Sequence, residues 1–325
     1  MRQFGLAFNR LFERWMFLII PVSLVLGFLL ADELQPFIQA VPYLFAYVTL
    51  TMAIGCGLRQ LREVLAKPGV MVLAFIIAHI VSPFIAYFAG VLIFGQDSPY
   101  VIGLVLFAII PLGVSSVLWV GMSGGSVPLM LAMVVLDSLL SPLVVPAGIG
   151  LMFGSVIEID IWPLMIDLFI IIVLPTIIGV GLYELSRGRI QAAVQPYSAP
   201  LSKLCFVSVV ALNASAIEPY MEQLGSDMLL LLPVVIILVS LCYALGFFSL
   251  SKRGNYPLQV TLSYASGMRN ISLGIVLALG YFSPIAAVPV VLSILVQQPL
   301  ATLNHYLLQK LNNRKAGKAE APYVG

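Results

Sequence analysis

The chain has 325 residues, of which 61% are hydrophobic and only 9% are charged. Charged residues make up about 25% of soluble globular domains, so this composition excludes a soluble protein. The net charge of +2 gives no sign of a nucleic-acid partner, because membrane topology accounts for the basic residues.

Ten apolar runs, each long enough to cross a bilayer as a helix, follow one another along the chain. We expect them at residues 15–31, 41–58, 70–95, 99–122, 127–153, 161–185, 200–217, 228–250, 257–281 and 284–309. Spans in lipid must be helices or closed barrels, and these runs are too long for barrel strands. The predicted fold class is an all-α membrane protein, whose first run is an uncleaved helix rather than a signal peptide.

Connections with lysine and arginine alternate with connections that lack them, and this alternation predicts the orientation of the spans. Of the 16 basic residues, all except Arg269 fall in the N-terminal segment, in or beside the even-numbered connections, or in the C-terminal tail. The odd-numbered connections carry acidic residues instead, among them Asp32, Asp97 and Glu218. Basic loops mark the cytoplasmic side, so we expect a multi-pass protein of the bacterial inner membrane with both termini in the cytoplasm.

Ten spans divide into two halves of five, which enter the membrane from opposite sides. We expect an inverted repeat formed by residues 1–155 and 156–311, followed by a disordered cytoplasmic tail at 312–325. The three cysteines are scattered along the chain, and we expect them to pack as small apolar residues rather than to form a disulfide or metal set.

The fourth run of each half contains residues that interrupt a helix. In the first half these residues are Pro111, Gly113, Ser115 and Ser116. In the second half they are Ser263, Ser266, Gly267, Arg269 and Asn270. Paired interruptions at corresponding positions indicate a binding site near the membrane midplane. For either run alone, close helix packing through glycine and serine remains an equal alternative.

A layer of polar side chains at one depth of the membrane gives a second sign of a site. Arg269 lies about 18 Å into its run, at 1.5 Å per helical residue. Asp137 and His79 reach similar depth from the same side, and Gln297 and Gln298 reach similar depth in the tenth run. An unpaired charge at this depth costs about 2.5–3.5 kcal/mol, so we expect Asp137 and Arg269 to approach each other or to share a hydrated cavity. The alternatives are an architectural ion pair, and for His79 either a structural or a proton-carrying role.

Three stretches carry a recognisable pattern. They are GCGLRQLREVLAKPGV at Gly55–Val70, the run Pro111–Pro142 that reaches LLSPLVVP, and SGMRNISLGIVLAL at Ser266–Leu279. With the ten runs, they make the chain resemble the bile acid:sodium symporter family, in its bacterial apical-bile-acid-transporter-like branch. The resemblance implies a core domain of spans 3–5 and 8–10, a panel domain of spans 1, 2, 6 and 7, and ion and substrate sites on the crossing broken helices 4 and 9.

The chain departs from the family pattern at the residues that the resemblance assigns to sodium. The family has a serine–asparagine pair where this chain has Ser116 followed by Val117. Ala265 stands where the family has a glutamate, and Arg269 stands where it has a glutamine. The third-span glutamine of the family falls at or next to His79.

These departures lead to a hypothesis about the coupling ion. The guanidinium of Arg269 takes the place of a sodium ion and pairs with Asp137, so the fold is retained while sodium coupling is weakened or lost. Ser116 is then a residual sodium ligand, and coupling passes to a proton on Asp137 or His79 or is absent.

The leading interpretation is a secondary transporter that carries an organic anion of the carboxylate type by alternating access. Its site is expected to combine both interruptions with the buried polar layer, at Ser115, Ser116, Asp137, Ser266, Gly267, Met268, Arg269, Asn270, His79, Gln297 and Gln298. No cofactor is expected, sodium or a proton is the candidate coupling ion, and the partners are a small organic anion and the lipid bilayer. The sequence leaves the oligomeric state open.

Two other classes of function remain as alternatives. A sensor or receptor could keep the transporter fold and bind a small ligand without moving it. A polytopic membrane enzyme could use His79 and Asp137 as an acid–base pair, but the sequence has no zinc-protease motif, nucleophile elbow or P-loop. We therefore expect no catalytic residues.

Overall fold

The structure is a computed structural model that describes residues 2–65, 68–154, 160–220, 225, 227–250 and 255–319. Within these ranges the chain is helical, and its one β-type contact is an isolated bridge. The predicted boundary at 155–156 and the last residues of the predicted tail, 320–325, lie outside the described residues. The three cysteines are free and buried.

The helices follow one another with short connections. The first group is α1 (Arg2–Leu29), α2 (Ala31–Leu34), η1 (Gln35–Ala40), α3 (Val41–Ala53) and α4 (Leu58–Leu65). The next is α5 (Pro68–Ile76), η2 (Ile77–Val81), α6 (Ser82–Phe94), α7 (Pro99–Ile109), α8 (Ser116–Met122) and α9 (Val127–Phe153). The third is α10 (Ile161–Leu168), η3 (Phe169–Val173), α11 (Leu174–Leu185), α12 (Arg189–Ile217) and η4 (Glu218–Tyr220). The last is α14 (Asp227–Phe248), α15 (Tyr256–Gly267), α16 (Ile271–Tyr281) and α17 (Pro284–Ala319), which extends into the segment predicted as a tail.

Seven helical segments of the described chain are long and apolar enough to cross a membrane. They are Ala31–Ala53, Pro68–Phe94, Val127–Phe153, Trp162–Leu185, Arg189–Ala216, Asp227–Phe248 and Pro284–Asn312. Shorter apolar helices cover Leu18–Leu29, Pro99–Ile109 and Ile271–Tyr281. The protein is therefore an all-helical multi-pass membrane protein, whereas the count of ten spans and the inverted repeat remain predictions.

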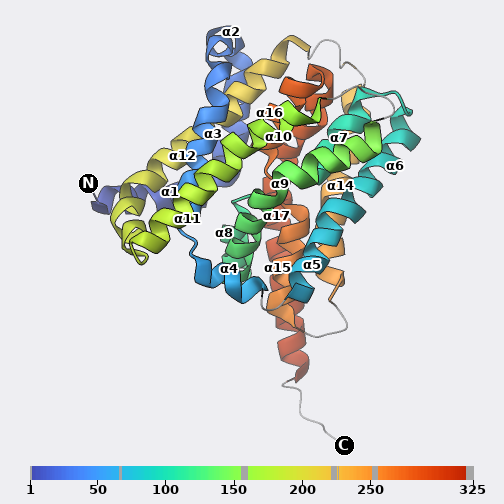
Figure 1. The fold of residues 1–325 in the computed structure, drawn as a ribbon. Coiled ribbons are helices and arrows are strands. Elements are labelled where there is room, and N and C mark those ends of the chain that lie inside the picture. Colours follow the sequence, from blue (N-terminus) through green and yellow to red (C-terminus); the bar gives the residue numbers. More distant parts are fainter. Residues whose placement is uncertain are drawn as a thin grey trace, which may run out of the picture.

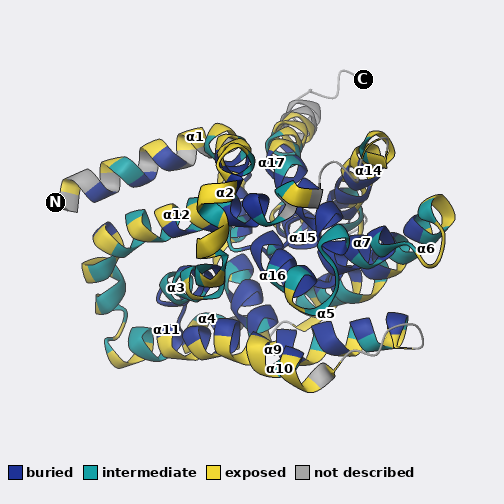
Figure 2. Ribbon diagram, turned by 90° about the horizontal axis from the view of Figure 1, so that it is seen from above, coloured by how far each residue is buried: buried dark blue, intermediate teal, exposed yellow. Residues whose placement is uncertain are grey.

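Large apolar side chains cover the outside of the molecule, as expected where lipid replaces water. Leu92 on α6 and Leu151 on α9 are 87% and 88% exposed. Seen from above, the centre around α7, α15 and α16 is buried, whereas exposed residues lie on the outer faces of the peripheral helices (Figure 2). The centre of the molecule, and not its rim, is where a polar site can be enclosed.

The helices form two groups, which are visible side by side in Figure 1. One group contains α1, α3, α11 and α12, which pack on one another. The other contains α6, α7, α14, α15 and α17, which are also in mutual contact. Helices α12 and α17 contact each other across the two groups. Residues of both groups can therefore line one cavity.

Two helices are interrupted near the centre of the molecule. Helix α7 ends at Ile109, and the chain becomes helical again at Ser116, where α8 begins. Helix α15 ends at Gly267, Met268 is extended, and α16 begins at Ile271. Pro111 has no backbone N–H to donate and disfavours the helical conformation of the residue before it, which explains the first interruption.

Candidate functional site

The two interruptions cross and hydrogen-bond to each other through their backbones. Leu112 and Arg269 form an isolated antiparallel bridge. The N–H of Gly113 donates to the carbonyl of Met268 at 3.0 Å, and the N–H of Asn270 donates to the carbonyl of Pro111 at 2.8 Å. Buried backbone groups freed from a helix need partners, and here each broken helix supplies them for the other.

Gly113 permits this close approach. A Cβ atom at this position would lie 2.7 Å from the carbonyl oxygen of Arg269, which is closer than real Cβ contacts allow. That neighbour is backbone, which cannot rotate away as a side chain can. The crossing therefore depends on the absence of a side chain at Gly113.

Two neighbouring glutamines of α17 contact the two interruptions. Gln297 accepts a hydrogen bond from the Arg269 N–H at 2.7 Å and donates one to the Arg269 carbonyl at 3.2 Å. Gln298 accepts from the indole of Trp119 at 3.0 Å and lies 3.5 Å from the Ser115 hydroxyl. The structure thus brings both predicted glutamines to the crossing, with Gln297 engaged by the backbone of Arg269.

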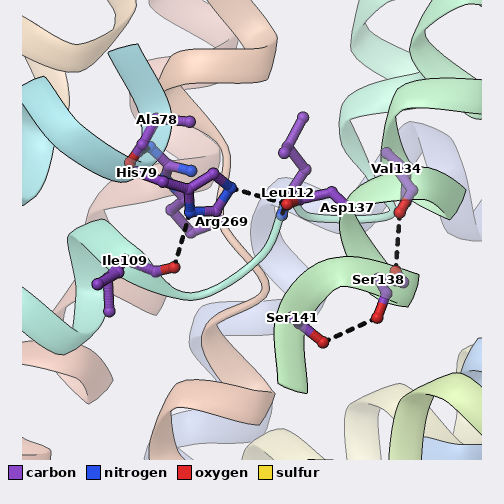
Figure 3. A network of polar contacts seen from close by, with 9 residues as sticks. All are labelled: Ala78, His79, Ile109, Leu112, Val134, Asp137, Ser138, Ser141 and Arg269. Carbon is purple, nitrogen blue, oxygen red and sulfur yellow. Dashed lines mark hydrogen bonds and ion pairs between the residues drawn. The ribbon is translucent and has the colours of Figure 1, made fainter. Parts of the chain in front are cut away.

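The buried polar layer centres on a histidine–aspartate pair. His79 Nε2 lies 2.7 Å from Asp137 Oδ1, and His79 Nδ1 lies 3.1 Å from the carbonyl oxygen of Ile109. The second oxygen of Asp137 accepts the N–H of Leu112 at 2.7 Å. Figure 3 shows this chain of contacts from the end of α7 through His79 to Asp137 on α9. The pair therefore joins η2 and α9 to the first interruption.

A wide helical turn positions His79. Residues Ile77–Val81 form a π-helical turn, in which hydrogen bonds span one residue more than in an α-helix. Pro83, one residue beyond Ser82, lacks the N–H that an α-helix would use, and the Ser82 hydroxyl donates to the Ile77 carbonyl at 2.8 Å. Such turns are often found at functional sites because they rotate the following side chains.

Arg269 is 1% exposed and holds its side chain in the same layer. Its Nη2 donates to the carbonyl of Ala78 at 3.0 Å, while Nε and Nη1 have no hydrogen-bond partner among the described residues. Among the described residues no hydrogen bond or ion pair joins Arg269 directly to Asp137, whose oxygens contact His79 Nε2 and the Leu112 N–H. The guanidinium and the carboxylate still interact electrostatically.

The other predicted residues divide between the cavity and the core. Ser115 and Asn270 line the cavity described next. Ser116 is fully buried, and its hydroxyl donates to the carbonyl of Gly113 at 2.5 Å. Ser266 is fully buried without a hydrogen-bond partner among the described residues. Gly267 lies against the ring of Tyr243, and Met268 is fully buried.

A cavity of about 700 Å³ lies between the crossing and the group of α1, α3 and α12. The crossing contributes Gly113, Ser115, Arg269 and Asn270 to its lining, and α17 contributes Gln297 and Gln298. Most of the remaining wall is apolar and includes Phe12 of α1, Phe45 of α3 and Phe206 of α12. The volume suits a small organic molecule.

The polar wall opposite the crossing was missed by the sequence analysis. Gln191, Gln195, Ser198 and Ser202 line the cavity from α12, together with Lys203. The first four are spaced by four, three and four residues, so they share one helix face. This polar stripe on a membrane helix was the available signal. The ammonium of Lys203 donates to the backbone and side-chain oxygens of Asn9 at 3.2 and 3.1 Å.

The chain is similar to members of one transporter family. The profile of the Sodium Bile acid symporter family matches residues 41–219. Uncharacterized protein YbaS of Bacillus subtilis (strain 168) is 36% identical over 295 residues, which cover 90% of this chain and 96% of YbaS. The uncharacterized sodium-dependent transporter YocS of the same organism is 27% identical over 286 residues, 85% of this chain and 87% of YocS. The probable sodium/metabolite cotransporter BASS2, chloroplastic, of Oryza sativa subsp. japonica is 26% identical over 254 residues, 76% of this chain and 58% of BASS2.

Proposed function

Because this chain belongs to the sodium bile acid symporter family, we propose that it is a secondary transporter that carries a small organic anion across the membrane by alternating access. The family is one of transporters, and YocS and BASS2 are named as a transporter and a cotransporter, not as enzymes. The cavity beside the crossing is the observation that carries the proposal.

The charge of the cavity favours an anion. Its charged lining residues are Lys203 and Arg269, and none of the described residues that line it is acidic. The crossing adds Asn270 and the first residues of α16, whose N–H groups have no partner within the helix. Lys203 therefore provides positive charge for a carboxylate group and the start of α16 provides hydrogen-bond donors, while the rest of the substrate contacts apolar side chains.

Alternating access is supported by the position of the cavity relative to the predicted topology. Asn9, Gly55 and Gln191 line the cavity, and the basic-residue alternation assigns their segments to the cytoplasmic side. Helix α16 runs from the crossing toward the other side and packs against α3 and α12. We propose that this arrangement represents an inward-facing state, and that separating α16 from α3 and α12 would open the other side.

The names of the relatives favour sodium as the coupling ion. The buried layer, however, does not have the oxygen ligands of a sodium site. One oxygen of Asp137 accepts the N–H of Leu112, the other lies 2.7 Å from His79 Nε2, and the fixed cation of Arg269 shares the layer. Ser116 retains an oxygen that could serve as one ligand. We therefore propose that coupled sodium binds outside the layer of His79 and Asp137.

Uptake into proteoliposomes tests this function. The purified protein is reconstituted and offered a panel of labelled carboxylates under an inward sodium gradient, an inward proton gradient or no gradient, with protein-free liposomes as the control. Saturable uptake of at least one carboxylate, above that of the control, is the expected result. Saturable binding without uptake under all three conditions would instead favour a sensor that retains the transporter fold.

A further inference from the structure

The two ring nitrogens of His79 face a backbone carbonyl oxygen, which can only accept a hydrogen bond, and a carboxylate oxygen, which also only accepts when it is ionised. Nδ1 lies 3.1 Å from the carbonyl oxygen of Ile109, and Nε2 lies 2.7 Å from Asp137 Oδ1. A neutral imidazole has one N–H and one lone pair. With a neutral histidine and an ionised aspartate, one of these two short contacts would bring two lone pairs together.

One additional proton satisfies both contacts. When Nδ1–H donates to Ile109, a second proton is required between Nε2 and Asp137 Oδ1, on one atom or the other. We propose that His79 and Asp137 form a proton-binding site that holds one exchangeable proton on this line. On release, the proton passes to water, His79 becomes neutral, and Asp137 remains ionised.

Arg269 lowers the free-energy cost of releasing this proton inside the membrane. An isolated buried carboxylate is strongly disfavoured, yet the guanidinium of Arg269 lies in the same layer and interacts with Asp137. The Nε and Nη1 groups have no partner among the described residues, so donors remain for the carboxylate. The three side chains carry one net positive charge with the proton bound and none after its release.

Few other titratable groups face the pair. Cys242 on α14 lies close to Arg269 and Ser82. Helix α7 and the first interruption present backbone groups to the pair, through Ile109 and Leu112. From its own helix, His79 meets the ring of Phe75 at 5.3 Å between ring centres. The charge of the site is therefore governed by His79, Asp137 and Arg269.

The site is closed in this conformation and is connected to the cavity through the backbone. The side chains of His79 and Asp137 are 6% and 1% exposed, and neither lines the cavity. Their contacts, Ile109 and Leu112, are the end of α7 and a residue of the interruption that presents Ser115 to the cavity. Release of the proton therefore changes the hydrogen-bond partners of the segment that contains Ile109 and Leu112. The effect of proton release on substrate transport rests on the proposed transport function, whereas the existence of the proton-binding site does not.

Nitrogen NMR of the purified full-length protein tests the proton directly. The sequence has two histidines, so a His305→Asn substitution leaves His79 as the single source of imidazole signals from isotope-labelled histidine. We expect the Nε2 signal of His79 to change reversibly as the pH is raised, while Nδ1 stays protonated. A His79 spectrum that is the same at every pH at which the protein stays folded would overturn the proposal.

Asp137→Asn gives the matched comparison, with Asp97→Asn, at an exposed position in the connection between α6 and α7, as its control. Loss of the carboxylate should move the His79 titration to lower pH, and Asp97→Asn should leave it unchanged. An unshifted titration in Asp137→Asn would also contradict the proposal. If this variant does not fold, the titration of the His305→Asn protein decides alone. Because the measurement needs no substrate, its failure is distinguishable from a failure of the transport function.

Discussion

Gln297 binds both backbone polar groups of Arg269, accepting from its N–H at 2.7 Å and donating to its carbonyl at 3.2 Å. The glutamine is 3% exposed, so both contacts are buried. Gln297, which lies outside the interruption, thus completes the backbone hydrogen bonding of Arg269, the charged residue of the interruption. The side chain of Arg269 donates from Nη2 to the carbonyl of Ala78.

Gln297→Ala is expected to destabilise the protein, because it leaves a buried N–H and a buried carbonyl without partners. The expected loss is about 1–3 kcal/mol, measured as a lower melting temperature in detergent. Gln309→Ala, at an exposed position of the same helix, is the control and should melt like the wild type. Equal melting of both variants would contradict the role of Gln297.

Gly113→Ala is expected to disrupt the crossing, since the new methyl group would lie 2.7 Å from the carbonyl of Arg269. Overpacking of this kind costs about 1–3 kcal/mol, and we expect loss of carboxylate uptake in proteoliposomes. In Gly280→Ala the methyl group meets nothing within 4 Å, which makes it the matched control. Normal uptake by the Gly113→Ala protein would show that the crossing tolerates separation of its two backbones.

Lys203→Gln is expected to weaken substrate binding, because it removes a positive charge from the cavity wall. We expect KM to rise about tenfold, equivalent to about 1.4 kcal/mol, with kcat nearly unchanged. Lys310→Gln, at an exposed position of α17, controls for general charge, and Lys203→Arg should restore most of the affinity. A fall in kcat without a change in KM would instead assign Lys203 to the packing of α1 against α12 through Asn9.

Arg269→Gln is expected to make the pair of His79 and Asp137 hold its proton more tightly. Without the guanidinium, the ionised carboxylate loses its nearby positive charge, and the protonated state of the pair is favoured. The His79 titration should then move to higher pH, opposite to the shift expected for Asp137→Asn. No shift, or a shift to lower pH, would show that the guanidinium does not stabilise the ionised carboxylate.

The sequence was sufficient to locate the interruptions. Pro111 and Gly113 in one run, and the polar stretch from Ser266 to Asn270 in another, lie where the structure leaves the helical conformation. Depth alone also brought His79, Asp137 and Arg269 into one layer. What could not be predicted was the rotation of each helix. The π-helical turn at Ile77–Val81 accompanies the contact of His79 with Asp137, and Pro83 alone is not enough to predict such a turn.

The roles of the glutamines and the polar wall depended on tertiary packing. Depth placed Gln297 and Gln298 near the site, but their partners, the backbone of Arg269 and the indole of Trp119, come from distant segments. The stripe of Gln191, Gln195, Ser198 and Ser202 lines the cavity because α12 faces the crossing, which is a tertiary contact that the sequence alone does not give. The start of α12 at Arg189 also includes residues that the predicted run 200–217 left out.

Counterflow is the most direct measurement of the central claim. Proteoliposomes are loaded with an unlabelled carboxylate that the protein takes up, diluted into a trace of the labelled compound, and kept at equal sodium concentration and pH on both sides. The account predicts transient accumulation of label that depends on the internal carboxylate and is lost in Gly113→Ala but not in Gly280→Ala. Saturable binding of the same carboxylate without any exchange of label would contradict a transporter.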